Sequence, residues 1–164
     1  MDGSAVRKVE LNQYLTFQLG KEIFALGIGQ VREVLDYTEI TRVPRTPAYL
    51  RGVINLRGGV VPVIDLRLNF GMTRTEQTVN TCIIVVEVNL DGELIVLGVL
   101  ADSVQEVVDM EPENIEPAPH LGTKLNTEFI KGMGKINNGF VMILDIDKVF
   151  SSDDLATVQG SANQ

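Results

Sequence analysis

One stretch of the sequence decides the fold, a run of apolar residues broken by a glycine pair: Val53-Ile54-Asn55-Leu56-Arg57-Gly58-Gly59-Val60-Val61-Pro62-Val63-Ile64-Asp65-Leu66-Arg67. Residues 51–57 predict a strand, and residues 60–64 predict the strand that returns beside it. Gly58-Gly59 predicts the turn between them, because glycine adopts the positive φ angles that tight hairpin turns require. Pro62 has no backbone N–H to donate, so we expect its strand to lie at a sheet edge or to contain a bulge.

Short strands and tight turns continue on both sides of this hairpin. Alternating or continuous apolar runs predict further strands over 14–19, 22–28, 82–88, 94–100 and 140–146. The turns between neighbouring strands are marked by Gly20-Lys21, Asp91-Gly92 and Asn138-Gly139. Prolines predict loops over 41–47 and 111–119, and we expect one short helix over 30–35. Roughly eight to ten short strands with little helix predict an all-β barrel or sandwich.

The chain contains an internal duplication. Residues Val63-Ile64-Asp65-Leu66 recur 80 positions later as Ile143-Leu144-Asp145-Ile146. Residues Val31-Arg32-Glu33-Val34-Leu35-Asp36 recur 73 positions later as Val104-Gln105-Glu106-Val107-Val108-Asp109, and Leu26-Gly27 matches Leu97-Gly98 after a further small gap. We therefore expect two related β-barrel subdomains, roughly 14–70 and 82–150, packed on each other. Strand exchange across their boundary is left open.

Composition restricts the class of protein. The 164 residues hold 14 Lys and Arg against 22 Asp and Glu, a net charge of −8, which disfavours nucleic acid and anionic membrane as partners. No apolar run is long enough to span a bilayer, the N-terminus lacks the apolar core of a signal peptide, and Cys82 is the single cysteine. These features predict a cytoplasmic globular domain. Residues 1–13 are expected to be a flexible tail, and 151–164 a polar tail with one helical turn around Leu155.

The sequence offers no catalytic constellation. His120 is the only histidine, and Cys82 begins an apolar strand, which favours an inert buried thiol over a nucleophile. Gly27-Ile28-Gly29 lacks the third glycine of a dinucleotide loop, where Arg32 stands instead. The acidic run from Glu106 to Glu116 does not have the spacing of a calcium-binding loop. We therefore expect no catalytic residue, no cofactor, no metal and no enzymatic activity.

Residues 53–67 closely resemble the signature of the CheW family, the bacterial chemotaxis coupling proteins. Other segments resemble the family as well, so that the resemblance covers about residues 14–150: Tyr14 to Ile28, Val31 to Val34, Ala101 to Val107, Pro117-Ala118-Pro119 and Gly132 to Asp145. The resemblance implies a CheW-like fold, all-β, with two packed five-stranded SH3-like barrels and a few short helices. It also implies an adaptor that binds the regulatory domain of the histidine kinase CheA and the cytoplasmic tips of methyl-accepting chemoreceptors, recruited from the cytoplasm to membrane-bound receptor arrays. Other CheW-like modules in array rings are further partners that it implies.

The resemblance also suggests two sets of binding residues. Receptor binding is expected at Val31, Glu33, Arg57 and Val104, with the valines at the floor of an apolar groove and a Glu33–Arg57 pair at its rim. Kinase binding is expected at Arg51, Gly52, Val53 and Ile54, on an edge strand able to pack against a similar barrel. The alternative for each valine is an ordinary core position, and for Arg57 a solvated turn arginine.

Two other functions are open at this point. One is a β-barrel module that binds a small molecule or nucleic acid, and the other is a CheW-like domain of the CheV type. Few aromatic residues, no tryptophan and the charge of −8 argue against nucleic acid, because binding single strands needs exposed rings on which bases stack. The adaptor is the leading hypothesis.

Overall fold

The protein is described here by a computed structural model that covers residues 12–117, 129–136 and 139–150. Strands dominate these residues, and the few helices are one turn long, which confirms the expected all-β class. The expected tails, 1–13 and 151–164, fall outside the described residues except for Asn12 and Gln13. In chain order the elements are β1 (Gln13–Leu19), β2 (Glu22–Gly27), η1 (Ile28–Gln30), β3 (Val31–Asp36), β4 (Leu50–Leu56), β5 (Gly59–Ile64), α2 (Leu66–Asn69), β6 (Cys82–Leu90), β7 (Glu93–Ala101), β8 (Ser103–Asp109), η2 (Pro112–Asn114), β9 (Ile115–Glu116), β10 (Ile130–Ile136), β11 (Gly139–Leu144) and α3 (Ile146–Val149).

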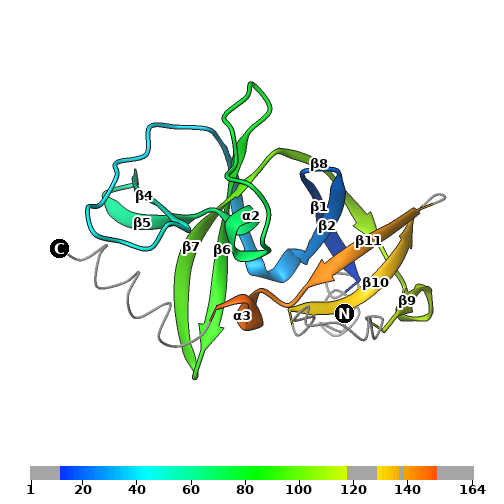
Figure 1. The fold of residues 1–164 in the computed structure, drawn as a ribbon. Coiled ribbons are helices and arrows are strands. Elements are labelled where there is room, and N and C mark those ends of the chain that lie inside the picture. The colour runs from blue at the N-terminus through cyan, green and yellow to red at the C-terminus, as the bar shows by residue number, and fades with distance from the viewer. Residues whose placement is uncertain (1–11, 118–128, 137–138, 151–164) are drawn as a thin grey trace.

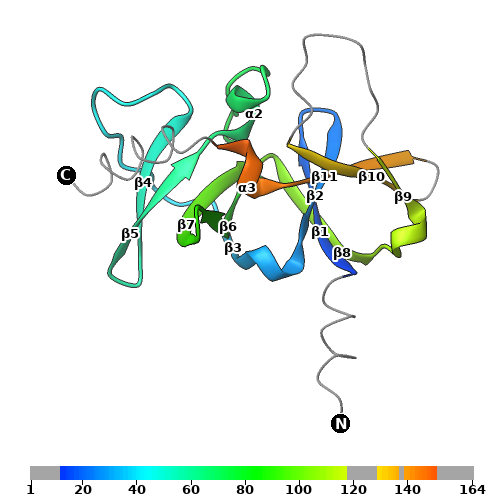
Figure 2. The same cartoon turned by 90° about the horizontal axis from the view of Figure 1, so that it is seen from below.

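The strands form two sheets, and each sheet combines strands from both halves of the sequence. One sheet has six strands in the order β8-β1-β2-β11-β10-β9, and the other has five in the order β3-β6-β7-β5-β4 (Figures 1 and 2). The first hairpin of each repeat thus lies in a sheet whose other strands come from the other repeat: β1–β2 lies with β8 to β11, and β6–β7 lies with β3 to β5. Parallel pairing of β2 with β11 and of β7 with β5 joins the exchanged hairpins to their new sheets. The ranges 14–70 and 82–150 therefore describe sequence repeats that are interleaved in space.

The pairing registers follow the duplication closely. Val63 pairs with Gly98, and Ile143, which lies 80 positions after Val63, pairs with Ala25. Ala25 is therefore the counterpart of Gly98, at the same offset of 73 that relates β3 to β8. This register corrects the sequence-based match of Leu26-Gly27 with Leu97-Gly98, which was two residues out.

The expected helix over 30–35 is wrong, because those residues form the end of η1 and most of strand β3. A bulge between Val31 and Glu33 shifts the register by one residue, so that Val31 faces Val86 while Val34 faces Ile84. Both partners lie on the same face of β6, in one apolar cluster. The bulge thus places two apolar residues three positions apart on one face of a strand, a spacing that is typical of helices.

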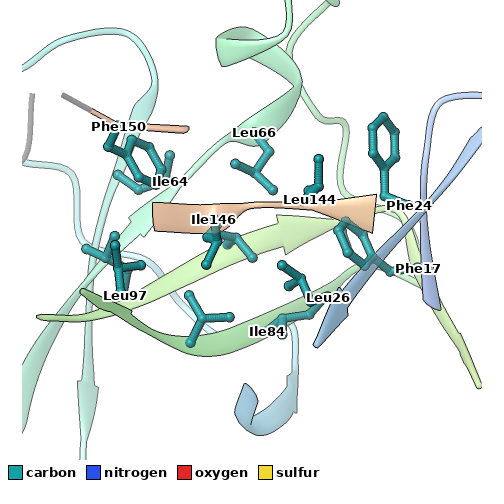
Figure 3. Packing of buried hydrophobic residues seen from close by; sticks show 14 of the residues in the cluster. Phe17, Phe24, Leu26, Ile64, Leu66, Ile84, Leu97, Leu144, Ile146 and Phe150 are labelled. Carbon is teal, nitrogen blue, oxygen red and sulfur yellow. The ribbon is translucent and has the colours of Figure 1, made fainter. Parts of the chain in front are cut away.

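A single large apolar cluster lies between the sheets. Leu26, Ile84, Leu97 and Leu144 come from both sheets, are 0–1 % exposed, and meet in this central cluster (Figure 3). The opposite faces of the sheets enclose two smaller clusters, one around Val63 and Leu100 and the other around Met110, Val141 and Ile143. Strand β6 contributes to the central cluster on one face and to a barrel interior on the other, which explains its continuous apolar sequence.

Within the described residues, the helices are too short and too polar to cross a membrane.

We expect Leu97→Ala in β7 to lower the free energy of unfolding by about 2–5 kcal/mol, because it removes a fully buried side chain from the central cluster. The matched control is Leu94→Ala in the same strand, where the side chain is 64 % exposed and the change should be within about 0.5 kcal/mol. Urea unfolding followed by circular dichroism measures both variants. Equal effects of the two substitutions would contradict the assignment of the cluster.

Candidate functional site

Arg57 lies in the tight turn between β4 and β5. Arg57 and Gly58 have φ angles of 51° and 83°, both in the left-handed region, as a two-residue turn of type I′ requires. The turn thus begins one residue before the predicted Gly58-Gly59, and Gly59 is the first residue of β5. The Gly58 amide donates to the side-chain oxygen of Asn55 at 3.0 Å, which holds the turn closed. This backbone fixes the position from which the Arg57 side chain extends.

Arg57 and Glu33 form the predicted ion pair. Both terminal nitrogens of Arg57 donate to the Glu33 carboxylate, at 2.7 and 3.0 Å, in a bidentate arrangement. Strands β3 and β4 are opposite edges of the five-stranded sheet, so the pair connects the two ends of a sheet that curls on itself. The hydrogen bond from Arg57 lowers the pKa of Glu33, and the bond to Glu33 raises the pKa of Arg57. The Arg57 side chain is 73 % exposed, which leaves it accessible to a partner.

Val31 and Val104 occupy equivalent positions on the two outer strands β3 and β8. Both are half-buried and pack against the central cluster, Val31 opposite Val86 and Val104 opposite Phe17. Each strand exposes a further valine that sequence reasoning missed, Val34 at 41 % and Val107 at 50 % exposure. The repeated Val-x-Glu-Val motif was the signal that could have indicated them. The two edge strands therefore present apolar side chains beside the Glu33 carboxylate and its counterpart, Glu106.

The residues expected to bind a kinase have mostly internal positions. Ile54 is 3 % exposed and packs inside the barrel of the five-stranded sheet. Gly52 is buried with a φ of 148°, and any Cβ there would collide with the carbonyl oxygen of Thr41. Arg51 has a side chain that is 12 % exposed and forms an ion pair, 3.3 Å long, with the fully buried Asp65. Val53 differs from the other three residues, because its side chain is half-buried and lies neither in the barrel interior nor in an ion pair.

The outward face of the β4–β5 hairpin is apolar. Val53 pairs with Pro62 across the two strands, and Asn55 pairs with Val60, so all four share one face of the hairpin. Val60 is 56 % exposed and was not among the residues that sequence reasoning selected. Its position in the alternating pattern after the turn could have indicated it. Val53 and Val60 together provide the apolar surface that the prediction had assigned to Val53 and Ile54.

The described residues contain no cluster of three or more His, Cys, Asp or Glu side chains that could hold a metal ion. The Cys82 thiol donates to the carbonyl oxygen of Asn80 at 3.3 Å, and Cys82 is half-buried at the start of β6. His120 lies outside the described residues. The arrangement that the described residues show is an ion pair with an exposed arginine beside edge strands that carry exposed apolar side chains.

Comparison with known proteins gives consistent matches over most of the chain. A family model, the CheW-like domain, matches residues 13–154. Chemotaxis protein CheW of Klebsiella aerogenes is 36 % identical over 150 residues, which cover 92 % of this chain and 88 % of that protein. A probable chemotaxis protein CheW of Rhizobium etli is 33 % identical over 142 residues, covering 87 % and 89 %. The crystal structure of the scaffolding protein TtCheW from Thermoanaerobacter tengcongensis superposes with a TM-score of 0.76 at 33 % identity, covering 87 % of this chain and 90 % of that chain.

Removing the arginine side chain should raise the pKa of Glu33. We expect Arg57→Gly, which suits the positive φ, to raise this pKa back toward the ordinary value of a glutamate, because the carboxylate loses its hydrogen bonds. The ion pair is present above the folded-state pKa of Glu33 and is lost as the pH falls through it. Carboxyl NMR titration measures the change. Arg32→Ala is the control and should give a smaller rise, since Arg32 acts on Glu33 only through its charge; an equal or larger rise would contradict the assignment.

Proposed function

This chain belongs to the CheW-like domain family, and we propose on that basis that it is a non-enzymatic adaptor that couples chemoreceptors to the histidine kinase CheA. The observation that carries the proposal is the exposed Glu33–Arg57 pair, placed beside apolar edge strands in a fold shared with a scaffolding protein. The adaptor is expected to act in the cytoplasm at membrane-bound receptor arrays. Its other expected partners are further CheW-like modules in those arrays.

We propose that the receptor tip docks on the surface formed by Val31, Glu33, Arg57 and Val104. A receptor tip is helical, and a helix binds through an apolar stripe flanked by charges. Half-buried Val31 and Val104 supply apolar contacts, and Val34 adds exposed apolar area on the same strand as Glu33. The Arg57 guanidinium, held by Glu33 yet mostly exposed, supplies a positioned charge at the rim.

We propose that the kinase docks on the outward face of the β4–β5 hairpin. By resemblance, the regulatory domain of CheA contains the same module, so a barrel-to-barrel contact is expected. Val53 and Val60 form the contact, while Arg51, Gly52 and Ile54 maintain the shape of the strand from within. An apolar centre of this kind is typical of stable protein interfaces.

The placement of four phenylalanine side chains supports a protein-binding role over the binding of single-stranded nucleic acid, and Phe140, at 54 % exposure, is the one exposed aromatic residue in the described part of the chain. Phe17, Phe24, Phe70 and Phe129 stack in a row with ring centroids 6.0, 5.5 and 4.5 Å apart. All four pack in or against the central cluster, so their rings stabilise the fold. Base stacking requires rings on the surface.

Reversing the charge of Arg57 should weaken receptor binding. We expect Arg57→Glu to lower the affinity for membranes that contain chemoreceptors by at least about fivefold, because the positioned rim charge changes sign. The thermal unfolding transition should persist, since the side chain is mostly exposed. Co-sedimentation measures binding, and Lys148→Glu, a second exposed site, is the control for overall charge. Unchanged co-sedimentation of the Arg57 variant would overturn the receptor assignment.

A charge on the outward face of β4 should weaken kinase binding. We expect Val53→Glu to reduce the affinity for the regulatory domain of CheA by at least about tenfold, because a carboxylate would be buried in an apolar contact. Titration calorimetry measures the affinity of both proteins in solution. Val79→Glu, at a side chain that is 100 % exposed, is the matched control and should bind normally. Equal affinities of the two variants would contradict this kinase face.

A further inference from the structure

A second surface with a distinct character lies at the other end of β4. A cleft of about 640 Å³ opens between residues 42–48, the start of β4, and a wall formed by Leu68 and Arg74. Its described lining contains four arginines and no carboxylate: Arg42, Arg45, Arg51 and Arg74. Figure 2 shows the loop before β4 and the β4–β5 turn at opposite ends of this strand, so the cleft is separate from the Glu33–Arg57 pair.

Three of the four arginines that line this cleft have no hydrogen-bonded or ion-paired partner in the described part of the chain. Arg51 is paired with the buried Asp65 and also donates to the carbonyl oxygen of Thr75 at 3.0 Å. Arg42, Arg45 and Arg74 are exposed, and none of them has a hydrogen bond or ion pair with another described residue. Three guanidinium groups without a partner among the described residues are therefore gathered at one cleft of a chain whose net charge is −8.

Hydrogen bonds and two prolines restrain the backbone of the loop that carries two of these arginines. Thr41 and Val53 exchange backbone hydrogen bonds of 2.9 and 2.8 Å at its start, and Leu50 donates to Pro47 at 3.0 Å at its end. The Thr46 hydroxyl donates to the carbonyl oxygen of Val43 at 2.7 Å, and proline fixes φ at two positions. Arg45 has a φ of 62°, which a residue with a Cβ rarely adopts. The backbone of such a loop has little conformational entropy left to lose on binding, whereas the exposed arginine side chains keep their rotamer freedom.

The side chains that line the cleft suit a ligand that carries several carboxylates and also has apolar groups. Guanidinium groups bind carboxylates in a bidentate manner, and three of them suit several carboxylates in sequence. The cleft also has apolar surface, supplied by the half-buried Leu68 on its wall and by the prolines of the loop. A peptide can cover this surface, whereas a small inorganic anion cannot. The described lining contains no aromatic ring on which a nucleic-acid base could stack. We propose that this cleft binds an acidic peptide segment of a partner protein, a site that goes beyond the proposed receptor and kinase faces.

The test uses the full chain and a defined probe, hexaglutamate with blocked termini, titrated into the ¹⁵N-labelled protein. We expect saturable shifts of the backbone amides of Arg42, Val43, Arg45, Thr46, Ala48 and Arg74, weakening as salt is raised from low to moderate concentration. Arg74→Glu should lower the affinity at least about fivefold. Lys21→Glu changes the net charge equally at an exposed position in the β1–β2 turn, outside the cleft, and should leave binding unchanged.

A second variant guards against a folding artefact. Arg45→Gly removes a charge while relieving a positive φ, so the melting temperature should not fall although binding weakens. Shifts that are equal for the Arg74 and Lys21 variants, or scattered over the surface, would overturn the proposal. So would saturable binding of inorganic phosphate or hexathymidylate at the cleft with an affinity equal to that of the peptide. The assay contains neither kinase nor receptor, and its outcome is therefore independent of the proposed adaptor function.

Discussion

The packing of one apolar cluster between two interleaved sheets is the constraint on which the rest of the structure depends. Leu26 reaches this cluster from the six-stranded sheet and Leu97 from the five-stranded sheet, and both are completely buried. Each sheet needs a hairpin from one repeat and the remaining strands from the other. The two sequence repeats are therefore joined by backbone hydrogen bonds within each sheet, and the two sheets meet through apolar contact. A shared core of this kind favours one rigid body over two hinged subdomains.

This rigid arrangement positions the candidate surfaces. It leaves β3 and β8 as the outer strands of their sheets, and the curl of the five-stranded sheet brings Glu33 on β3 to Arg57 beyond β4. The equivalent strand of the second repeat, β8, makes different contacts at the matching position. Glu106, the counterpart of Glu33, exchanges hydrogen bonds through its main chain with the buried Thr16 hydroxyl, at 2.8 and 3.2 Å. The two repeats thus share a backbone arrangement, and the ion pair of Glu33 with Arg57 distinguishes the first repeat from the second.

Much of the fold could be predicted because it depends on local patterns. The hairpin at Asp91-Gly92 was evident, and both residues have the positive φ angles expected of that turn. The Glu33–Arg57 pair was also predicted, through the family resemblance. Long-range features were less accessible: the bulge in β3 imitates helical spacing, and the exchange of hairpins leaves no local signal. The internal role of Arg51 depends on Asp65, 14 residues away, which itself accepts hydrogen bonds from Thr75. Such networks follow from the tertiary structure, and single-sequence patterns do not encode them.

Native-state hydrogen exchange on the full chain, measured at increasing denaturant concentration, tests the central claim most directly. If the central cluster makes both sheets one cooperative unit, the slowest amides of β2 and β7 must converge on the same free energy of opening. They must also show the same dependence on denaturant, because the same surface is exposed in both cases. The contradictory result is a sheet that opens fully while the other stays protected. That outcome would show two independent subdomains and would remove the rigid platform on which the proposed surfaces depend.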